Sequence, residues 1–407
     1  MMLIKLAWRN IFRNKRRTII TGIAIGVGLA SLIFVDALII GMEENMIKSA
    51  TASFLGEGQI HARNFRQTGE VEKTINNLNR VAADLAKEKI VQYFSLRVMS
   101  FGMITSPSNV SALNLVGINP ENEKYLSQID ETISKGTYFQ SGKEREIVIG
   151  TKLAEILEVG LGERVVVTVA QAKTGNLTQE MFRVSGIYHF NIDEMDRGMA
   201  FVRLPKAQEM FGLDGEVHEI AIKFVDPKYG RDESLAFWNK YSQGGNEAAG
   251  WTIFLPQLKA AFEFSSFSTY IIGVILFGII ALGIVNTLFM SLYERMFEFG
   301  VLRALGTRPF SIARLIVWEA GALAIVSISL GVILGFLINC LTAYTGIDYT
   351  GIEYAGVTVR ELIYPVLKVK QFIIYPLWVF IFTVVVGIYP AVYAARMPPV
   401  EAMKRSL

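Results

Sequence analysis

The sequence has few of the residues that most often build disulfides and metal sites. It contains one cysteine, Cys340, in 407 residues. Its three histidines are scattered along the chain: His61, His189 and His218. A single cysteine excludes an intrachain disulfide, and one cysteine with dispersed histidines does not suggest a zinc site.

Catalytic motifs are missing as well. The chain contains no G-x-x-x-x-G-K-[ST] loop for nucleotide phosphates, no G-x-S-x-G and no H-E-x-x-H. The acidic residues Asp193, Glu194 and Asp196 could hold a hard cation, but a solvated turn between strands is the favoured interpretation. We therefore expect no catalytic residue, no metal and no cofactor on this chain.

Charge is also scarce. Charged residues make up 19% of the chain, against roughly 25% in soluble domains, and hydrophobic residues make up 52%. Four runs contain no charged residue: 18–35, 264–293, 320–344 and 371–395. Each is close to or longer than the roughly 18–20 apolar residues that cross a bilayer as a helix. The sequence thus predicts four transmembrane helices, at 18–41, 268–291, 314–338 and 372–395.

The first run has an alternative interpretation as a cleaved signal peptide, because Lys15, Arg16 and Arg17 precede it. Its apolar run is longer than the roughly 7–15 residues of a signal sequence, and no convincing A-x-A cleavage site follows. A retained membrane helix is therefore favoured.

The positive charges near the predicted spans indicate an orientation. Lysines and arginines gather in three segments: 1–17, 292–313 and 396–407. With four spans these segments lie on one side, which the positive-inside rule makes cytoplasmic. The segments 42–267 and 339–371 then lie outside the cytoplasm, and 396–407 is a cytoplasmic tail. The net charge of +3 is explained by this topology and does not indicate nucleic-acid binding.

Segments outside the spans also carry patterns. Residues 1–17 are predicted to form an amphipathic helix on the cytoplasmic membrane surface, with an extension of the first span as the alternative. Residues 71–93 have helical spacing, whereas β-branched and aromatic runs between Gly and polar turns mark a β-rich module at about 145–205. We therefore predict an α-helical membrane protein with a large α+β extracytoplasmic domain.

Small residues recur at four-residue intervals in two of the predicted spans. They are Gly22, Gly26 and Ala30 in the first span and Gly331 and Gly335 in the third. Such ladders allow close helix packing, although glycine is enriched in membrane helices generally. We expect a dimer packed through the first span.

Two acids and three aromatic residues are candidates for a substrate path. Asp36 and Glu319 fall within predicted spans, where an ionisable group is a functional hypothesis by default. Either could also reach water, and Glu319 could pair with Arg314. The aromatic candidates precede or begin the second span: Phe264, Phe267 and Tyr270.

The segment between the second and third spans, 291–309, is too charged to span a membrane and too apolar for an ordinary loop. On a helical wheel, Glu294, Arg295 and Glu298 occupy about one-third of the circumference and apolar side chains cover most of the rest. Gly306 can cap this helix and Pro309 prevents its continuation. Such a helix needs contact on two sides, one with the spans and one with a partner protein. A continuation of the second span is the alternative.

The sequence resembles the FtsX/MacB/LolC-E superfamily of ABC transporter permeases. The resemblance rests on "LAWRNIFRNKRRTIITGIAIGVG", on "ERMFEFGVLRALGTRPFSIARLIVWEA" and on "YPAVYAARMPPVEAMK". In that family the short helix after the second span is the coupling helix, which docks on a separate ATPase. The resemblance implies coupling residues here: Glu294, Arg295, Phe297, Glu298, Phe299, Arg303, Leu305 and Gly306.

The stand-alone layout looks most like LolC and LolE, which extract lipoproteins from the inner membrane. This resemblance implies cytoplasmic ATPase subunits that hold ATP and magnesium, a second permease copy or paralogue, the bilayer and a lipoprotein substrate. It places the chain in the bacterial inner membrane with both termini cytoplasmic. A periplasmic carrier is a further candidate partner, although segment 170–181 is short where LolC has a long hook. The alternatives are a MacB-type export permease and an FtsX-like regulator of cell-wall hydrolases.

Overall fold

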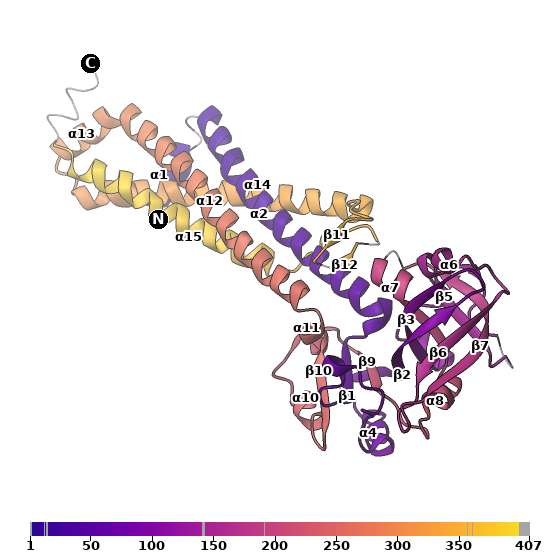
Figure 1. Ribbon diagram of the computed structural model, residues 1–407. Helices are drawn as coiled ribbons and strands as arrows, with labels where there is room; N and C mark the ends of the chain where they lie inside the picture. Colours follow the sequence, from indigo (N-terminus) through magenta and orange to yellow (C-terminus); the bar gives the residue numbers. More distant parts are fainter. Residues whose placement is uncertain are drawn as a thin grey trace. The chain divides into compact units, whose positions relative to one another are not determined.

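The structure, a computed structural model, describes residues 2–11, 13, 15–140, 143–190, 192–355, 357–359 and 361–398. The chain divides into two compact units (Figure 1). The helical unit comprises residues 1–44, 262–349 and 361–407, and the sheet unit comprises residues 45–261 and 350–360. Each unit is described by itself below.

Long apolar helices build the helical unit. Its helices are α1 (Met2–Ile11), α2 (Lys15–Ala50), α12 (Pro256–Glu294), α13 (Met296–Ala304), α14 (Pro309–Thr345) and α15 (Gln371–Arg396). Among the described residues, four helices are long and apolar enough to cross a membrane: α2 with its continuation, α12, α14 and α15. The prediction of four membrane helices is confirmed. Each helix contains the corresponding predicted span and extends beyond it.

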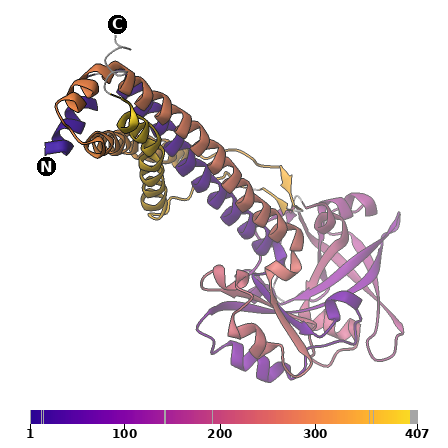
Figure 2. The ribbon, with the colours of Figure 1, turned by 90° about the vertical axis from the view of Figure 1, so that its left-hand side faces the viewer.

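Two apolar clusters hold these helices together. The first joins Ile25, Leu29 and Ile33 of α2 to Ile280 and Ile284 of α12 and to neighbours on α14 and α15. Figure 2 shows α2 and α12 lying side by side. The second cluster joins the short helices to the ends of the long ones: Ala7, Leu292, Met296, Phe299, Ile312, Leu315, Ile316, Ala391 and Ala394. The packing of Ala7 places α1 against the other helices of this unit.

The small-residue ladder of α2 packs inside the chain. A Cβ added to Gly331 would lie 2.7 Å from the carbonyl oxygen of Gly26, and one added to Gly335 would lie 3.3 Å from the Cα of Ala30. The ladders of α2 and α14 therefore face each other, which only very small residues permit. The close helix packing predicted from these small residues is therefore found within the chain, between α2 and α14. Because α14 occupies the ladder, a dimer packed through the first span would use another face of α2, and that dimer stays a prediction. Gly22 lies on this side too, with Ser327 its nearest neighbour.

A mixed sheet forms the second unit. Its strands are β1 (Gly58–Ala62), β2 (Val91–Thr105), β3 (Val110–Ile118), β4 (Ile133–Gly136), β5 (Glu146–Gly150), β6 (Arg164–Ala170), β7 (Leu177–Tyr188), β8 (Met199–Arg203), β9 (Glu219–Phe224) and β10 (Asn246–Gly250). Within the described residues these make one ten-stranded sheet, in the order β10-β1-β9-β2-β3-β8-β5-β7-β4, with β6 pairing β2 and β7. A separate hairpin pairs β11 (Glu353–Tyr354) with β12 (Val357–Thr358).

Short helices connect the strands. They are η2 (Thr51–Leu55), a π-helix that continues α2, and α3 (Phe65–Thr68), α4 (Leu78–Leu85), α5 (Pro120–Glu123), α6 (Thr151–Leu157), α7 (Asp193–Gly198), α8 (Leu204–Phe211), α9 (Lys228–Arg231), α10 (Ala236–Tyr241) and α11 (Trp251–Phe254). The predicted large extracytoplasmic domain therefore appears as an α/β domain with a mixed sheet.

The long strand β2 corrects two details of the predicted domain. It runs for 15 residues and pairs with β9 at its start and with β3 and β6 at its end. The predicted module at 145–205 is therefore continuous with the rest of the sheet and is not a separate insertion. The helical pattern at 71–93 yields only the eight-residue α4, because turns precede and follow it and residues from Val91 onward join β2.

The acidic group at 193–196 is also different from its prediction as a solvated turn. Asp193, Glu194 and Asp196 lie on α7. Asp196 is buried, accepts a hydrogen bond from the Phe190 backbone N–H at 2.7 Å and pairs with His189. Its role is to hold the β7–α7 turn. No cluster that could hold a metal ion occurs in the described part of the chain.

Candidate functional site

The segment between α12 and α14 forms the predicted short helix. Arg295 is its non-helical N-cap, and α13 runs from Met296 to Ala304. Gly306 adopts φ +93°, a conformation that glycine reaches without strain, and Pro309 starts α14. The chain therefore leaves α12, makes two and a half turns and enters α14, so that α13 is a distinct helix and not a continuation of the second span.

One face of α13 is buried against the other helices. Met296 and Phe299 belong to the apolar cluster with α1, α14 and α15. Phe299 is 5% exposed, which corrects its prediction as a residue that contacts a partner. The guanidinium carbon of Arg295 lies 4.9 Å from the centroid of the Phe299 ring, a cation–π contact.

Arg295 and Glu319 form the polar centre of this region. Arg295 Nη1 lies 2.5 Å from Glu319 Oε1, and both side chains are less than a tenth exposed. Asn10 of α1 donates a second hydrogen bond to the same Glu319 oxygen, at 2.7 Å. Arg295 is thus a link between helices and not a surface contact, and Glu319 pairs with Arg295 and not with Arg314. The pairing satisfies a carboxylate that would otherwise be costly to bury.

Glu298 extends this network to the surface. Arg295 Nε lies 3.2 Å from Glu298 Oε2, and Arg13 Nη1 lies 2.9 Å from Glu298 Oε1. Partial burial would raise the pKa of Glu298, but Arg13 and Arg295 outweigh it and lower the pKa below its ordinary value. Asn10 and Arg13 had not been singled out in the sequence. Their only signal was the basic, amphipathic pattern of segment 1–17.

Arg303 connects α13 to the last helix. Its Nη1 donates to the backbone carbonyls of Ala395, at 2.7 Å, and Met397, at 3.2 Å. These carbonyls lie at the C-terminal end of α15, where a cation also stabilises the helix dipole. Arg303 is therefore a part-buried link between α13 and α15, and its contact with a partner stays a prediction. The nearby motif residues Pro399, Glu401 and Ala402 lie outside the described residues.

The opposite face of α13 is exposed and largely apolar. Phe297 is 52% exposed, Leu302 41% and Leu305 79%. These three positions and Glu298 fall within about 140° of the helix circumference, since each residue turns roughly 100°. Glu294, at the end of α12, is exposed as well. Three of the predicted coupling residues thus lie on the inner side: Arg295, Phe299 and Arg303. Phe297, Glu298 and Leu305 lie on the opposite side together with Leu302, which was not predicted, and we call these four residues the outer face of α13 (Phe297, Glu298, Leu302 and Leu305).

The candidates for a substrate path lie on two helices, Asp36 on α2 and the three aromatic residues on α12. Asp36 accepts a hydrogen bond from Gln371 Nε2 at 2.7 Å, so this acid has a partner on α15. Phe264, Phe267 and Tyr270 are exposed on α12, by 67%, 59% and 76%. Their spacing of three residues places them on one side of that helix. Their role in a substrate path stays a prediction.

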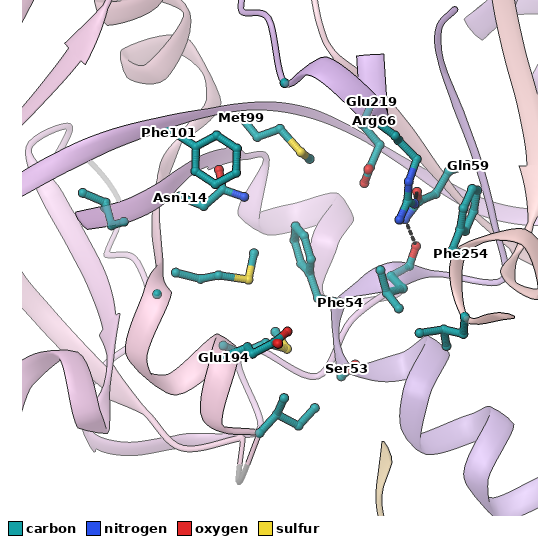
Figure 3. Close-up of a pocket in the computed structure, with 18 of the residues that line it drawn as sticks. Ser53, Phe54, Gln59, Arg66, Met99, Phe101, Asn114, Glu194, Glu219 and Phe254 are labelled. Atoms are coloured by element: carbon teal, nitrogen blue, oxygen red, sulfur yellow. Dashed lines mark hydrogen bonds between the residues drawn. The ribbon is translucent and has the colours of Figure 1, made fainter. Parts of the chain in front are cut away.

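A wide pocket lies in the sheet unit, and sequence analysis did not foresee it. Its volume is about 690 Å³. The walls come from η2, β1, α3, β2, β3, α7, α11 and residue Val357, which are far apart in the sequence. Figure 3 shows Phe54 near the middle of the view, between Arg66 with Phe254 on one side and Phe101 with Asn114 on the other. Most of the lining is aromatic, methionine or aliphatic.

A fully buried ion cluster lies beneath this pocket. Arg97 bridges two carboxylates, with Nη2 2.5 Å from Glu123 Oε1 and Nη1 2.7 Å from Glu219 Oε1. His61 Nε2 lies 2.9 Å from the other oxygen of Glu219, and the Phe54 ring covers the Arg97 guanidinium at 3.9 Å. Burial alone would raise the pKa of Glu219, but His61 and Arg97 outweigh it and lower this pKa to about 2.

Four long apolar helices, a short helix between the second and third of them and a large sheet domain are the features of a membrane protein with a domain outside the bilayer. Comparisons with known families agree. The family described as FtsX-like permease C-terminal matches residues 270–399, and the family described as MacB-like periplasmic core domain matches residues 18–229, more than half of the chain. The chain belongs to the FtsX-like permeases with a MacB-like periplasmic core domain, as the sequence resemblance predicted.

Individual relatives are similar at low identity. LolE of Haemophilus influenzae, a lipoprotein-releasing system transmembrane protein, is 21% identical over 81% of this chain and 79% of its own length. LolC of Xylella fastidiosa, of the same system, is 25% identical over 71% of this chain and 72% of its own. The macrolide export ATP-binding/permease protein MacB of Psychrobacter cryohalolentis is 24% identical over 96% of this chain and 58% of its own length.

These findings establish the class. The protein is an ABC transporter permease of the LolC/LolE/MacB family, a membrane protein with an extracytoplasmic domain. Permeases of this family are generally non-enzymatic components that work with ATPase subunits.

Proposed function

We propose that this chain is the permease of a transporter that extracts lipoproteins from the outer leaflet of the bacterial inner membrane for delivery to the outer membrane. The observation that carries the proposal is the extent of the likeness to the lipoprotein-releasing proteins. It covers 79% of LolE and 72% of LolC, and thus most of each relative. The matched MacB is covered over 58% of its length.

In this proposal the outer face of α13 docks on a separate cytoplasmic ATPase, which holds ATP and magnesium. An exposed apolar face on a short helix is a natural protein contact, since fully burying one leucine stabilises a complex by roughly 1.5–3 kcal/mol. The inner face of α13 supports the role, because a displacement of α13 is passed on by Arg295 to α14 and by Arg303 to α15. Both chain ends then lie in the cytoplasm and the sheet unit in the periplasm.

The movement reaches the periplasmic side through the long helices. Residues of α2 and of α12 belong to both units, so neither helix ends at the boundary between them. A conformational cycle of the ATPase would therefore act on the sheet unit through continuous helices and expel a lipid-anchored substrate. ATP can drive such a change only through different affinity for two states of the permease. A second permease copy or a paralogue completes the transporter, through a surface other than the α2 ladder.

The docking part of this proposal is tested by co-purification of the ATPase with the full chain. Phe297→Asp and Leu305→Asp should each reduce the recovered ATPase about tenfold or more, because a charge replaces a buried apolar contact worth at least about 1.4 kcal/mol. Leu177→Asp is the matched control, since Leu177 is 74% exposed on β7 of the sheet unit. These positions are sharper probes than Glu298, whose replacement would also break its pairs with Arg13 and Arg295. Undiminished recovery with both α13 variants would contradict the docking assignment.

The substrate is tested by depletion of the protein in cells. Outer-membrane lipoproteins should then accumulate in the inner membrane, as measured by fractionation. Correct lipoprotein localisation after depletion would overturn the proposed substrate. It would favour the second candidate, a MacB-type export permease, for which the supporting observation is the match over 96% of this chain.

A further inference from the structure

The pocket of the sheet unit has the size and lining of a small-molecule site. Its volume of about 690 Å³ falls within the roughly 300–1,000 Å³ of typical ligand pockets. Phe101 is 73% exposed and Phe254 also borders the opening, so large apolar groups face the open space. Exposed apolar side chains in a concave site favour an apolar ligand. An extended hydrocarbon chain suits such a wall because methionine side chains adapt to irregular shapes.

A positively charged side chain, that of Arg66, lies at one edge of the pocket lining. Arg66 is exposed, its guanidinium lies 4.0 Å above the Phe254 ring, and its Nη1 donates a hydrogen bond to Gln59 Oε1 (Figure 3). Across the described ranges, no ion pair joins Arg66 to a carboxylate, and Glu219 and Glu247 act on its charge only at longer range. Gln59 and Phe254 hold the guanidinium in place, and most of its five N–H donors stay available for an anion.

The other charges of the lining give the pocket a direction. Glu219 and His61 are engaged in the buried cluster with Arg97. Glu194 is exposed and borders the pocket from α7. Figure 3 shows it well apart from Arg66. A ligand with one anionic group is therefore attracted at the Arg66 edge, while a second anionic group near α7 would be repelled.

The pocket is also lined by residues at two points where the chain passes between a long helix and the sheet unit. Phe54 and Leu55 end η2, which continues α2, and Phe254 and Leu255 directly precede α12. An occupant would touch the last residues of one long helix and the residues that lead into another. Its binding would be coupled to any change in these two segments, and the coupling would be reciprocal.

We propose that this pocket binds a single-chain amphiphile with one anionic group. The anionic group, a carboxylate or a phosphate, pairs with Arg66. The hydrocarbon chain lies along Phe54, Met99 and Phe101. This inference is independent of the proposed lipoprotein substrate, because it concerns a ligand of the sheet unit and its test needs no ATPase.

The test uses the full chain in phosphatidylcholine nanodiscs and three photoreactive probes. The probes share one hydrocarbon chain with a terminal diazirine and differ only in their head, which is a carboxylate, a phosphate or an alcohol. Crosslinked peptides are mapped by mass spectrometry. We expect at least one anionic probe to label peptides of β2 or α7 about tenfold more than the alcohol. The better of the two anionic probes then tells a fatty-acid-like ligand from a phosphate-bearing one.

Variants separate the pocket from general membrane partitioning. Arg66→Gln should reduce labelling by the anionic probe to the level of the alcohol. Arg63→Gln should leave it unchanged, because Arg63 is exposed nearby in the sequence but does not line the pocket. Ala112→Trp, at an exposed lining position of β3, should block labelling by all three probes. Equal labelling by alcohol and anion, no effect of Arg66→Gln, or labels confined to the long helices would each overturn the proposal.

Discussion

Each unit of this protein contains a buried arginine that bridges two carboxylates and lies against a phenylalanine ring. In the sheet unit, Arg97 joins Glu123 and Glu219 beneath Phe54, and Arg97 itself is fully buried. In the helical unit, Arg295 joins Glu319 and Glu298 beside Phe299. In two different folds, two carboxylates and a phenylalanine ring thus stabilise the charge of a buried arginine.

The two clusters differ in how far their carboxylates are from solvent. Glu123 and Glu219 are both buried, and His61 is the remaining partner of Glu219. Glu298 is about half exposed and is shared with the exposed Arg13. The Arg97 cluster is therefore closed, and removing a member strands a charge in the core. The Arg295 cluster has one partner that water can reach, so a change there is less costly.

The largest expected effect comes from opening the closed cluster. Arg97→Met should destabilise the sheet unit by about 3–5 kcal/mol, because two buried carboxylates lose their counter-charge. Hydrogen exchange of β2 peptides in the full chain measures the loss. Arg145→Met is the control, since Arg145 pairs with Glu180 at 2.9 Å at the surface and such pairs contribute about 0–1 kcal/mol. Equal exchange rates in the two variants would show that the Arg97 cluster is not a stability element.

Acid titrates the same cluster and should give a somewhat smaller effect. The folded-state pKa of Glu219 is about 2, below its ordinary value of 4.5. The ionised carboxylate therefore stabilises the fold fully above about pH 4.5, and this contribution is lost as the pH falls toward 2. The ceiling is roughly 3 kcal/mol, from about 1.4 kcal/mol for each pKa unit.

Thermal unfolding of the full chain between pH 6 and pH 2.5 measures this dependence. Glu219→Gln should be less stable at pH 6 and should lose less stability on acidification, because glutamine does not titrate. Parallel pH profiles for the two proteins would show that other groups govern acid unfolding.

Substitutions in the Arg295 cluster should give the smallest losses of stability, which tests its difference from the Arg97 cluster. Arg295→Met should cost roughly 1.5–3 kcal/mol, since Glu319 loses a charged hydrogen bond but keeps that from Asn10. Arg13→Gln should cost less than about 1 kcal/mol, because its pair with Glu298 is about half exposed on both sides. Hydrogen exchange of α13 and α14 peptides ranks the two variants. A loss for Arg13→Gln as large as that for Arg295→Met would remove the distinction between inner and outer partners.

Much of the helical unit could be predicted from the sequence. The four charge-free runs indicated the membrane helices, and the turn at Gly306 and Pro309 indicated where α13 ends. These are local properties, since the hydropathy of a run and the conformation of a glycine depend on neighbouring residues. The family likeness was also readable, because its motifs are continuous in the chain.

The roles of the individual charges in α13 were harder to predict. A helical wheel placed Arg295 beside Glu298 and assigned both to the surface. It could not show that Glu319 and Asn10 would lie against Arg295, because they are 24 and 285 residues away in the sequence. The α2 ladder was likewise a correct sign of close packing, but its partner was α14 of the same chain.

The sequence by itself therefore determined which segments are membrane helices, where the short helix between them lies and which family the chain belongs to. Only the tertiary structure decided which side chains of α13 point inward. It also decided that the strands β1–β10 are connected through β2 into a single sheet, and that a pocket forms between η2, α3, α7 and α11. The physical reason is that the hydropathy of a run is a sum over adjacent residues, so it can be read from the sequence. Ion pairs, ladders and cavities depend on residues that only folding brings together.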